Sequence, residues 1–359
     1  MFKINLDNQT AIKKLDKNQV AASLANLPKQ LTNSYNQAKK TKLPASFTKI
    51  DKLVFCGMGG SNLASELTRR IFGSEIKIPL VLVRGYNLPN FASKNTLVII
   101  SSYSGNTEET LSCLSQALKI KAKIICLSSG GKLEVLAKKY KLPYCKINPE
   151  FNPSNQPRHD IGSQLGTVLA LFGKLKLIKI SDQEINDAAA QLVTLGFTLL
   201  PNSPQSKNPA KQLAQKLYQK NLYLIGAEHL SANAHILANQ INESSKQLAN
   251  PYKIPELNHH FLEGLSIPEK VIKNTACLFL MSNNYSQPIS KRFIITKKVL
   301  NAKKINSFIL TSPDKNRLTE ALLMLAYSSW ISFYLAMLNR VNPAETPIVD
   351  WFKKELVKQ

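Results

Sequence analysis

The chain has 359 residues, of which 44% are hydrophobic, and its 47 Lys and Arg against 23 Asp and Glu give a net charge of +24. This length can bury more than one core and therefore favours two domains over one. The basic residues are scattered and no nucleic-acid-binding motif accompanies them, so we predict nonspecific attraction to anions and no specific nucleic-acid partner.

The N-terminal segment, residues 1–17, is polar and lacks the apolar stretch of a signal peptide. Five cysteines occur without a CxxC pair or a His/Cys cluster, as expected of a reducing compartment and of a protein without a structural metal. They are Cys56, Cys113, Cys126, Cys145 and Cys277. We therefore predict a cytoplasmic protein that uses no metal or other cofactor.

The first part of the chain alternates short apolar runs with segments of helical pattern. The predicted strands are residues 52–57, 78–85, 96–101 and 122–129, and the predicted helices lie near 60–72 and 106–119. Continuous apolar strands separated by helices are typical of a parallel sheet covered on both faces. The pattern predicts a doubly wound, flavodoxin-like α/β domain.

A polar stretch with three prolines, residues 148–162, predicts a boundary that divides the chain into domains 1–152 and 153–359. Helices near 160–176 and 182–198 follow. A weaker repeat of the α/β pattern then has predicted strands at 221–227, 276–282 and 304–310 and a helix near 231–247. The predicted fold class is therefore α/β with two similar parallel-sheet domains.

The strongest apolar segment is residues 322–338, which carries no charge over seventeen positions. That length reaches only the lower limit for a membrane span, and the segment contains three serines. We therefore predict a buried helix and no membrane association.

The first loop with a chemical signal is FCGMGGSNL, directly after the first predicted strand. Its glycines, Gly57, Gly59 and Gly60, allow a tight turn and close approach of the backbone to a ligand, and Ser61 stands at a predicted helix start. A dinucleotide site would need a third glycine where Asn62 stands, and an acid near the end of the next strand. The loop therefore favours a phosphate over a dinucleotide.

The second loop, SSYSGNTEET at residues 101–110, follows the predicted strand 96–101 and is rich in hydroxyl groups. Asn106 with Glu109 three positions later predicts a helix cap, which would place Ser102, Ser104 and Thr107 near the free N–H groups of the helix. A single hydroxyl suffices for a cap. The additional hydroxyls indicate a phosphate site built from neutral donors.

Five motifs occur in a fixed order along the chain: GMGGSN, SYSGNTEETL, QPR, NES and PELNHH. In sequence and spacing they resemble the bifunctional phosphoglucose/phosphomannose isomerase family, which is built from two sugar isomerase (SIS) domains. The resemblance spans nearly the whole chain. The first two motifs are typical of many SIS domains, whereas PELNH after a Glu-containing helix is more diagnostic of this isomerase family.

The resemblance implies an isomerase that interconverts glucose 6-phosphate, and mannose 6-phosphate as well, with fructose 6-phosphate through a cis-enediol. The positions that match the family's phosphate-binding residues are Gly60, Ser61, Ser102, Ser104 and Thr107. The matching general base is Glu243, although without the resemblance the sequence favours a surface residue paired with Lys246.

Four more residues take their predicted roles from the resemblance. His259 matches the ring-opening histidine, although His260 beside it replaces the usual asparagine and either ring could face the sugar. Arg158 matches the enediolate-stabilising arginine, with a surface ion pair as its alternative. Thr346 matches a residue that contacts the sugar, and Lys353 one that assists ring opening.

The family's histidine comes from a partner subunit, so the resemblance also implies a homodimer with shared active sites. A noncatalytic SIS-domain regulator that binds a phosphosugar is the alternative function. The sequence does not distinguish between glucose and mannose 6-phosphate as the preferred substrate.

Overall fold

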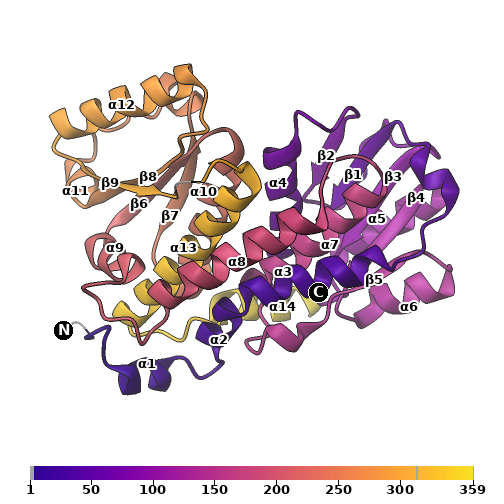
Figure 1. Ribbon diagram of the computed structural model, residues 1–359, viewed down its shortest axis with the longest axis horizontal. Coiled ribbons are helices and arrows are strands. Elements are labelled where there is room, and N and C mark those ends of the chain that lie inside the picture. The colour runs from indigo at the N-terminus through magenta and orange to yellow at the C-terminus, as the bar shows by residue number, and fades with distance from the viewer. Residues whose placement is uncertain (1–3, 313, 359) are drawn as a thin grey trace. The chain divides into compact units, whose positions relative to one another are not determined.

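A computed structural model describes residues 4–312 and 314–358 (Figure 1). Its contacts divide the chain into two compact units: Asn26–Leu192, here the first unit, and Met1–Ala25 with Val193–Gln359, here the second unit. This division differs from the predicted boundary at 152/153. The segment after the prolines belongs to the first unit because its helix packs on that unit's own helices.

The first unit contains a five-stranded sheet in the order β2-β1-β3-β4-β5 in which every pairing is parallel. Its strands are β1 (Lys52–Cys56), β2 (Leu80–Val83), β3 (Thr96–Ser101), β4 (Lys123–Ser128) and β5 (Tyr144–Lys146). Its helices are α3 (Leu27–Lys39), α4 (Gly60–Phe72), α5 (Glu108–Lys119), α6 (Gly131–Lys139), α7 (Ile161–Lys174) and most of α8 (Asp182–Leu199). The strand order is the flavodoxin-like one, which confirms the predicted fold class.

The strands of this sheet are apolar on both faces, as a doubly covered sheet requires. On one face Val54, Val98 and Ile100 form a core with Leu114 of α5 and Leu133 of α6. Elsewhere in the unit α7 packs closely along α3, because two of its three glycines, Gly162 and Gly166, face that helix. Cβ atoms there would meet the side chain of Gln30 and the backbone of Leu31.

The second unit contains a four-stranded parallel sheet in the order β7-β6-β8-β9. Its strands are β6 (Asn221–Gly226), β7 (Ala249–Lys253), β8 (Thr275–Met281) and β9 (Asn306–Thr311). Its helices are α1 (Gln9–Leu15), α2 (Val20–Ala25), α9 (Pro209–Leu217), α10 (Ser231–Gln240), α11 (Glu269–Lys273), α12 (Gln287–Ala302), α13 (Arg317–Leu338) and α14 (Pro347–Val357). In chain order this is the topology of the first sheet without its fifth strand.

α13 is the central helix of the second unit and packs against α2, α9 and α10. It is the one helix among the described residues that is long and apolar enough to cross a membrane, yet 94% of its apolar window is buried inside the protein. The prediction of a buried helix at 322–338 is confirmed.

Candidate active site

Two loops at the carboxyl edge of the first sheet carry the predicted phosphate-binding residues. β1 and β3 are neighbours whose crossovers leave in opposite directions, so their loops meet at the switch point where open α/β sheets bind ligands. After β1 the backbone turns at Gly59, whose φ of +46° favours glycine, and α4 begins at Gly60. A Cβ at Gly60 would lie 2.9 Å from Pro157 Cβ and 3.1 Å from the backbone nitrogen of Arg158. This loop is therefore in close contact with the segment that carries the predicted arginine.

The predicted hydroxyl groups are brought together in these two loops. The Oγ of buried Ser61 accepts a hydrogen bond from the Tyr103 N–H at 2.9 Å, which links the two loops directly. Ser102 Oγ and Thr107 Oγ1 are 2.8 Å apart, and exposed Ser104 accepts a bond from the backbone N–H two positions later. Each hydroxyl thus has an intramolecular contact. Because Ser61 and Ser104 use only an acceptor in these contacts, their protons remain available for a phosphate oxygen.

The predicted Asn106 cap is wrong. α5 begins at Glu108 with Thr107 as its N-cap residue, and the Asn106 side chain instead accepts a hydrogen bond from Lys132 N at 3.0 Å, at the start of α6. Gly105 beside it has φ +70°, and a Cβ there would collide with the Gly130 carbonyl. The loop after β3, residues 102–107 and here the hydroxyl loop, is thus braced by the loop after β4.

Arg158 lies on a short 3₁₀ helix, Pro157–His159, and is only 4% exposed. Its guanidinium donates a hydrogen bond to Gln156 Oε1 at 3.0 Å, and Gln30 from α3 holds the carbonyl of His159 at 3.0 Å. The alternative of a surface ion pair in a linker is therefore wrong. Arg158 is a buried residue in a braced segment next to the two loops that carry the predicted phosphate-binding residues.

Asp160 follows this short helix and is fully buried. Neither of its carboxylate oxygens has a hydrogen-bond partner in good geometry among the described residues. Burial raises its pKa to about 7, and the nearby Ser163 and Tyr103 hydroxyls offset only part of that rise. Sequence analysis missed this residue because nothing in the pattern QPRHDIG distinguishes a buried aspartate from a helix cap.

Glu243 lies in the second unit, on a π-helical turn, Ile241–Ser245, that continues α10. π-helical turns are often found at functional sites. The side chain is half-buried, and the alternative from the sequence, an ion pair between its carboxylate and Lys246, is not seen among the described residues. The Lys246 ammonium instead donates to main-chain carbonyls, including that of Glu243 at 3.0 Å. The carboxylate of Glu243 is thus left without a pairing cation among the described residues.

Lys246 also joins this turn to the segment before α14. Its ammonium donates to the carbonyls of Asn342 at 2.8 Å and Glu345 at 2.6 Å. Half-buried Thr346 comes next and is the N-cap residue of α14, on which Lys353 is exposed. The structure therefore brings the segments of Glu243 and Thr346 together, whereas Lys353 lies further along a helix in solvent.

His259 and His260 are both exposed at the carboxyl end of β7. Leu257, fully buried, anchors their loop, and the His260 ring lies 6.2 Å from the Tyr252 ring between centroids. The turn of Glu243 precedes β7, whose five residues span on the order of 15 Å. Within one chain, Glu243 and His259 therefore lie at opposite ends of β7.

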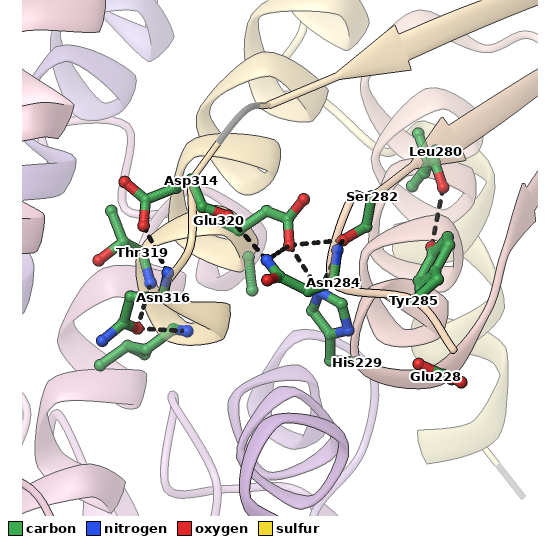
Figure 2. Close-up of polar contacts among 12 residues, drawn as sticks. Glu228, His229, Leu280, Ser282, Asn284, Tyr285, Asp314, Asn316, Thr319 and Glu320 are labelled. Atoms are coloured by element: carbon green, nitrogen blue, oxygen red, sulfur yellow. Dashed lines mark hydrogen bonds and ion pairs between the residues drawn. The ribbon is translucent and has the colours of Figure 1, made fainter. Parts of the chain in front are cut away.

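The corresponding edge of the second sheet has a different composition. There His229, after β6, and Glu320, on α13, form a fully buried pair with Nε2 and Oε2 2.7 Å apart (Figure 2). The same carboxylate oxygen accepts bonds from Ser282 at 2.7 Å and Asn284 at 2.8 Å. Sequence analysis missed this cluster because its members come from three distant segments. Among residues 4–312 and 314–358, no group of three or more His, Cys, Asp or Glu could hold a metal ion.

Comparison with known proteins gives the family. Residues 206–356 match the bacterial phospho-glucose isomerase C-terminal SIS domain. A bifunctional phosphoglucose/phosphomannose isomerase of Caldicellulosiruptor bescii is 33% identical over 94% of this chain and 98% of its own. The chain belongs to the bifunctional phosphoglucose/phosphomannose isomerase family. Another member, from Aquifex aeolicus, is 30% identical over 90% of this chain and 96% of its own.

The fold of this family member also agrees with solved structures. A hypothetical protein of Thermus thermophilus superposes with a TM-score of 0.74 at 15% identity, over 98% of this chain and 94% of its own. At that identity the likeness supports the fold alone. Together with the SIS-domain match, it confirms the prediction of two SIS-type parallel-sheet domains.

Proposed function

We propose that this protein is an aldose-ketose isomerase that interconverts glucose 6-phosphate and mannose 6-phosphate with fructose 6-phosphate. The relatives from C. bescii and A. aeolicus are named for phosphoglucose and phosphomannose isomerisation. The proposal depends on one observation in this chain: neutral hydroxyl donors from two loops lie at the switch point of the first sheet, in contact with the segment of buried Arg158. Such an arrangement suits a small phosphorylated ligand.

We assign binding of the substrate's phosphate to Gly60, Ser61, Ser102, Ser104 and Thr107. Neutral donors suit a dianion that must be released after each turnover, because they hold it without burying several opposite charges. Gly60 contributes by allowing close approach of the backbone, and Ser61 and Ser104 contribute hydroxyl protons that their bonds with backbone N–H groups do not use.

Proton transfer requires a base that can reach a carbon acid and a positive group for the enediolate. We assign the base to Glu243, which supplies a half-buried carboxylate with no cation paired to it among the described residues. Arg158 supplies a permanent charge for the enediolate. His259 opens the sugar ring, assisted by Lys353, and Thr346 contacts the sugar.

The active enzyme is proposed to be a homodimer in which His259 acts in the site of the partner subunit. Two features support this arrangement. Within one chain, Glu243 and His259 lie at opposite ends of β7, a strand that spans on the order of 15 Å. In addition, α14 exposes a continuous apolar face at Ile348, Trp351, Phe352 and Leu356, a surface suited to another copy of the chain.

The cytoplasm is the proposed location. There sugar phosphates are available to the enzyme, and the five cysteines, all buried and unpaired, stay reduced.

Solvent-hydrogen exchange tests the reaction directly. In D₂O, wild-type protein should incorporate deuterium at C1 or C2 of each 6-phosphate while it forms the other isomers. Glu243→Gln should lower kcat by about two orders of magnitude or more while substrate binding is retained. Glu269→Gln, which changes an exposed acid of the same unit, is the matched control. Folded wild-type protein that binds the sugar phosphates without any exchange would instead indicate a phosphosugar-binding regulator.

A further inference from the structure

Tyr103 occupies a different environment from Ser104 beside it. Its side chain is 4% exposed, whereas Ser104 is in solvent. Its backbone N–H donates to Ser61 Oγ at 2.9 Å, and its carbonyl accepts from the N–H and the hydroxyl of Ser129 at 2.9 and 2.7 Å. The main chain of this one residue therefore ties the hydroxyl loop to the loops after β1 and β4.

The Tyr103 hydroxyl reaches a third loop, the one that follows β5. It accepts a hydrogen bond from Asn152 Nδ2 at 2.9 Å, and the same amide donates to the Gln156 carbonyl at 3.1 Å. The Asn152 amide oxygen accepts from Ser154 Oγ at 2.7 Å. Gln156 in turn holds the Arg158 guanidinium through its side chain. A short path of buried and half-buried hydrogen bonds thus leads from the phosphate-binding loop to Arg158.

The bonds that Asn152 makes with Tyr103 and Ser154 are buried, so they constrain geometry strongly. Asn152 and Ser154 are 2% and 4% exposed, and a lost partner here would leave a polar group unsatisfied away from water. Burial and the carboxylate of Asp160 also raise the pKa of Tyr103, so its hydroxyl keeps its proton. A protonated phenol can accept from Asn152 and still donate to a neighbour.

We propose that Tyr103 is a positioning residue that holds the Arg158 side chain at a fixed position relative to the bound phosphate. The inference rests on the proposed isomerase function, in which Arg158 stabilises the enediolate. The main chain of Tyr103 shapes the phosphate-binding loop, and its hydroxyl sets the distance from that loop to the loop of Arg158. The two tasks are separable because only the second needs the hydroxyl.

Tyr103→Phe separates them experimentally. The variant keeps the ring and every main-chain contact, so KM for fructose 6-phosphate and inhibition by inorganic phosphate should stay within about twofold of wild type. The value of kcat should fall about tenfold or more, because a misplaced Arg158 loses contacts made only in the transition state. Tyr35→Phe is the matched control: its side chain is equally buried in the same unit, but its hydroxyl faces Asp182 on α8. That variant should retain the kcat of wild type.

Asn152→Ala provides an independent test, since it removes the other partner of the same bond. It should give the same selective loss of kcat, and the double variant should lose little more than either single variant. Additive losses, or a Tyr103→Phe enzyme with wild-type kcat or with a KM effect alone, would overturn the inference. A wild-type protein without isomerase activity would overturn the proposed function itself, which is a distinguishable result.

Discussion

Replacing Asp160 by Asn should change how the stability of the first unit depends on pH. The carboxyl is fully buried, and burial raises its pKa from 3.8 to about 7. Between these values the folded protein binds a proton that the unfolded chain has lost, so the free energy of unfolding falls as pH rises. Asp160 thus contributes stability that is fully present below about pH 4 and is lost as pH rises through about 7.

The size of the effect follows from the shift. About three pH units at 1.36 kcal/mol each give at most about 4 kcal/mol. The amide of the Asp160→Asn variant has no proton to lose, so the advantage of wild type over the variant should be largest near pH 4.5 and should shrink by several kcal/mol by pH 8.5. Subtracting the two proteins at each pH cancels the other titrating groups.

Hydrogen-deuterium exchange of β3 and α7 peptides is the suitable assay, because both tryptophans, Trp330 and Trp351, lie in the second unit and their fluorescence would not report on the first. Asp182→Asn is the control of opposite sign. Lys39 holds the pKa of Asp182 below its usual value, so that contribution is present at neutral pH and lost in acid. A stability difference between wild type and Asp160→Asn that stays constant from pH 4.5 to 8.5 would refute the reasoning.

The remaining predictions concern the phosphate-binding loop and the assembly. Gly105→Ala should destabilise the first unit by roughly 1–3 kcal/mol or more and abolish phosphate binding. Gly85→Ala is the control and should do neither, because no atom lies within 4 Å of the new Cβ. Thermal melts of both variants with and without phosphate compare them. Mixing inactive Glu243→Gln and His259→Asn subunits should restore about a quarter of wild-type activity, since randomly formed dimers would be half heterodimers with one intact site each. No recovery after verified subunit exchange would place both residues in one chain's site.

Much of the fold could be predicted because its central strands are buried on both faces and so form continuous apolar runs. β1, β2, β3, β4 and β6 fall within predicted segments, and β8 and β9 overlap theirs with one residue outside. The strands that were missed are edge strands. β5 has three residues, and β7 contains Pro251 with alternating exposure, so neither gives the apolar signal of a central strand.

The residue types of the candidate site could be predicted from the sequence, whereas the hydrogen-bond partners of its side chains could not. Hydroxyls and glycines after β1 and β3 indicate an anion site because the loops of adjacent parallel strands must meet. The partner of each polar group depends on tertiary contacts that no local pattern contains. Asn106 caps a helix other than its own, Arg158 is buried rather than exposed, and Asp160 and Tyr103 gain their importance only from the packing around them.

The two sheets share a topology, but their switch points differ in a way that favours the proposed anion site in the first unit only. α5 and α12 follow corresponding strands, β3 and β8, and each directs the positive end of its dipole toward a switch point. At the N-terminus of α12 a carboxylate already occupies the place of an anion. Glu228 accepts hydrogen bonds there from the N–H of Ser286 at 3.3 Å and from its hydroxyl at 2.6 Å. Buried Glu320 lies at the same edge (Figure 2). A phosphate at the start of α12 would have to displace the carboxylate of Glu228 and approach that of Glu320. At the start of α5 it would instead meet hydroxyl groups that can donate hydrogen bonds.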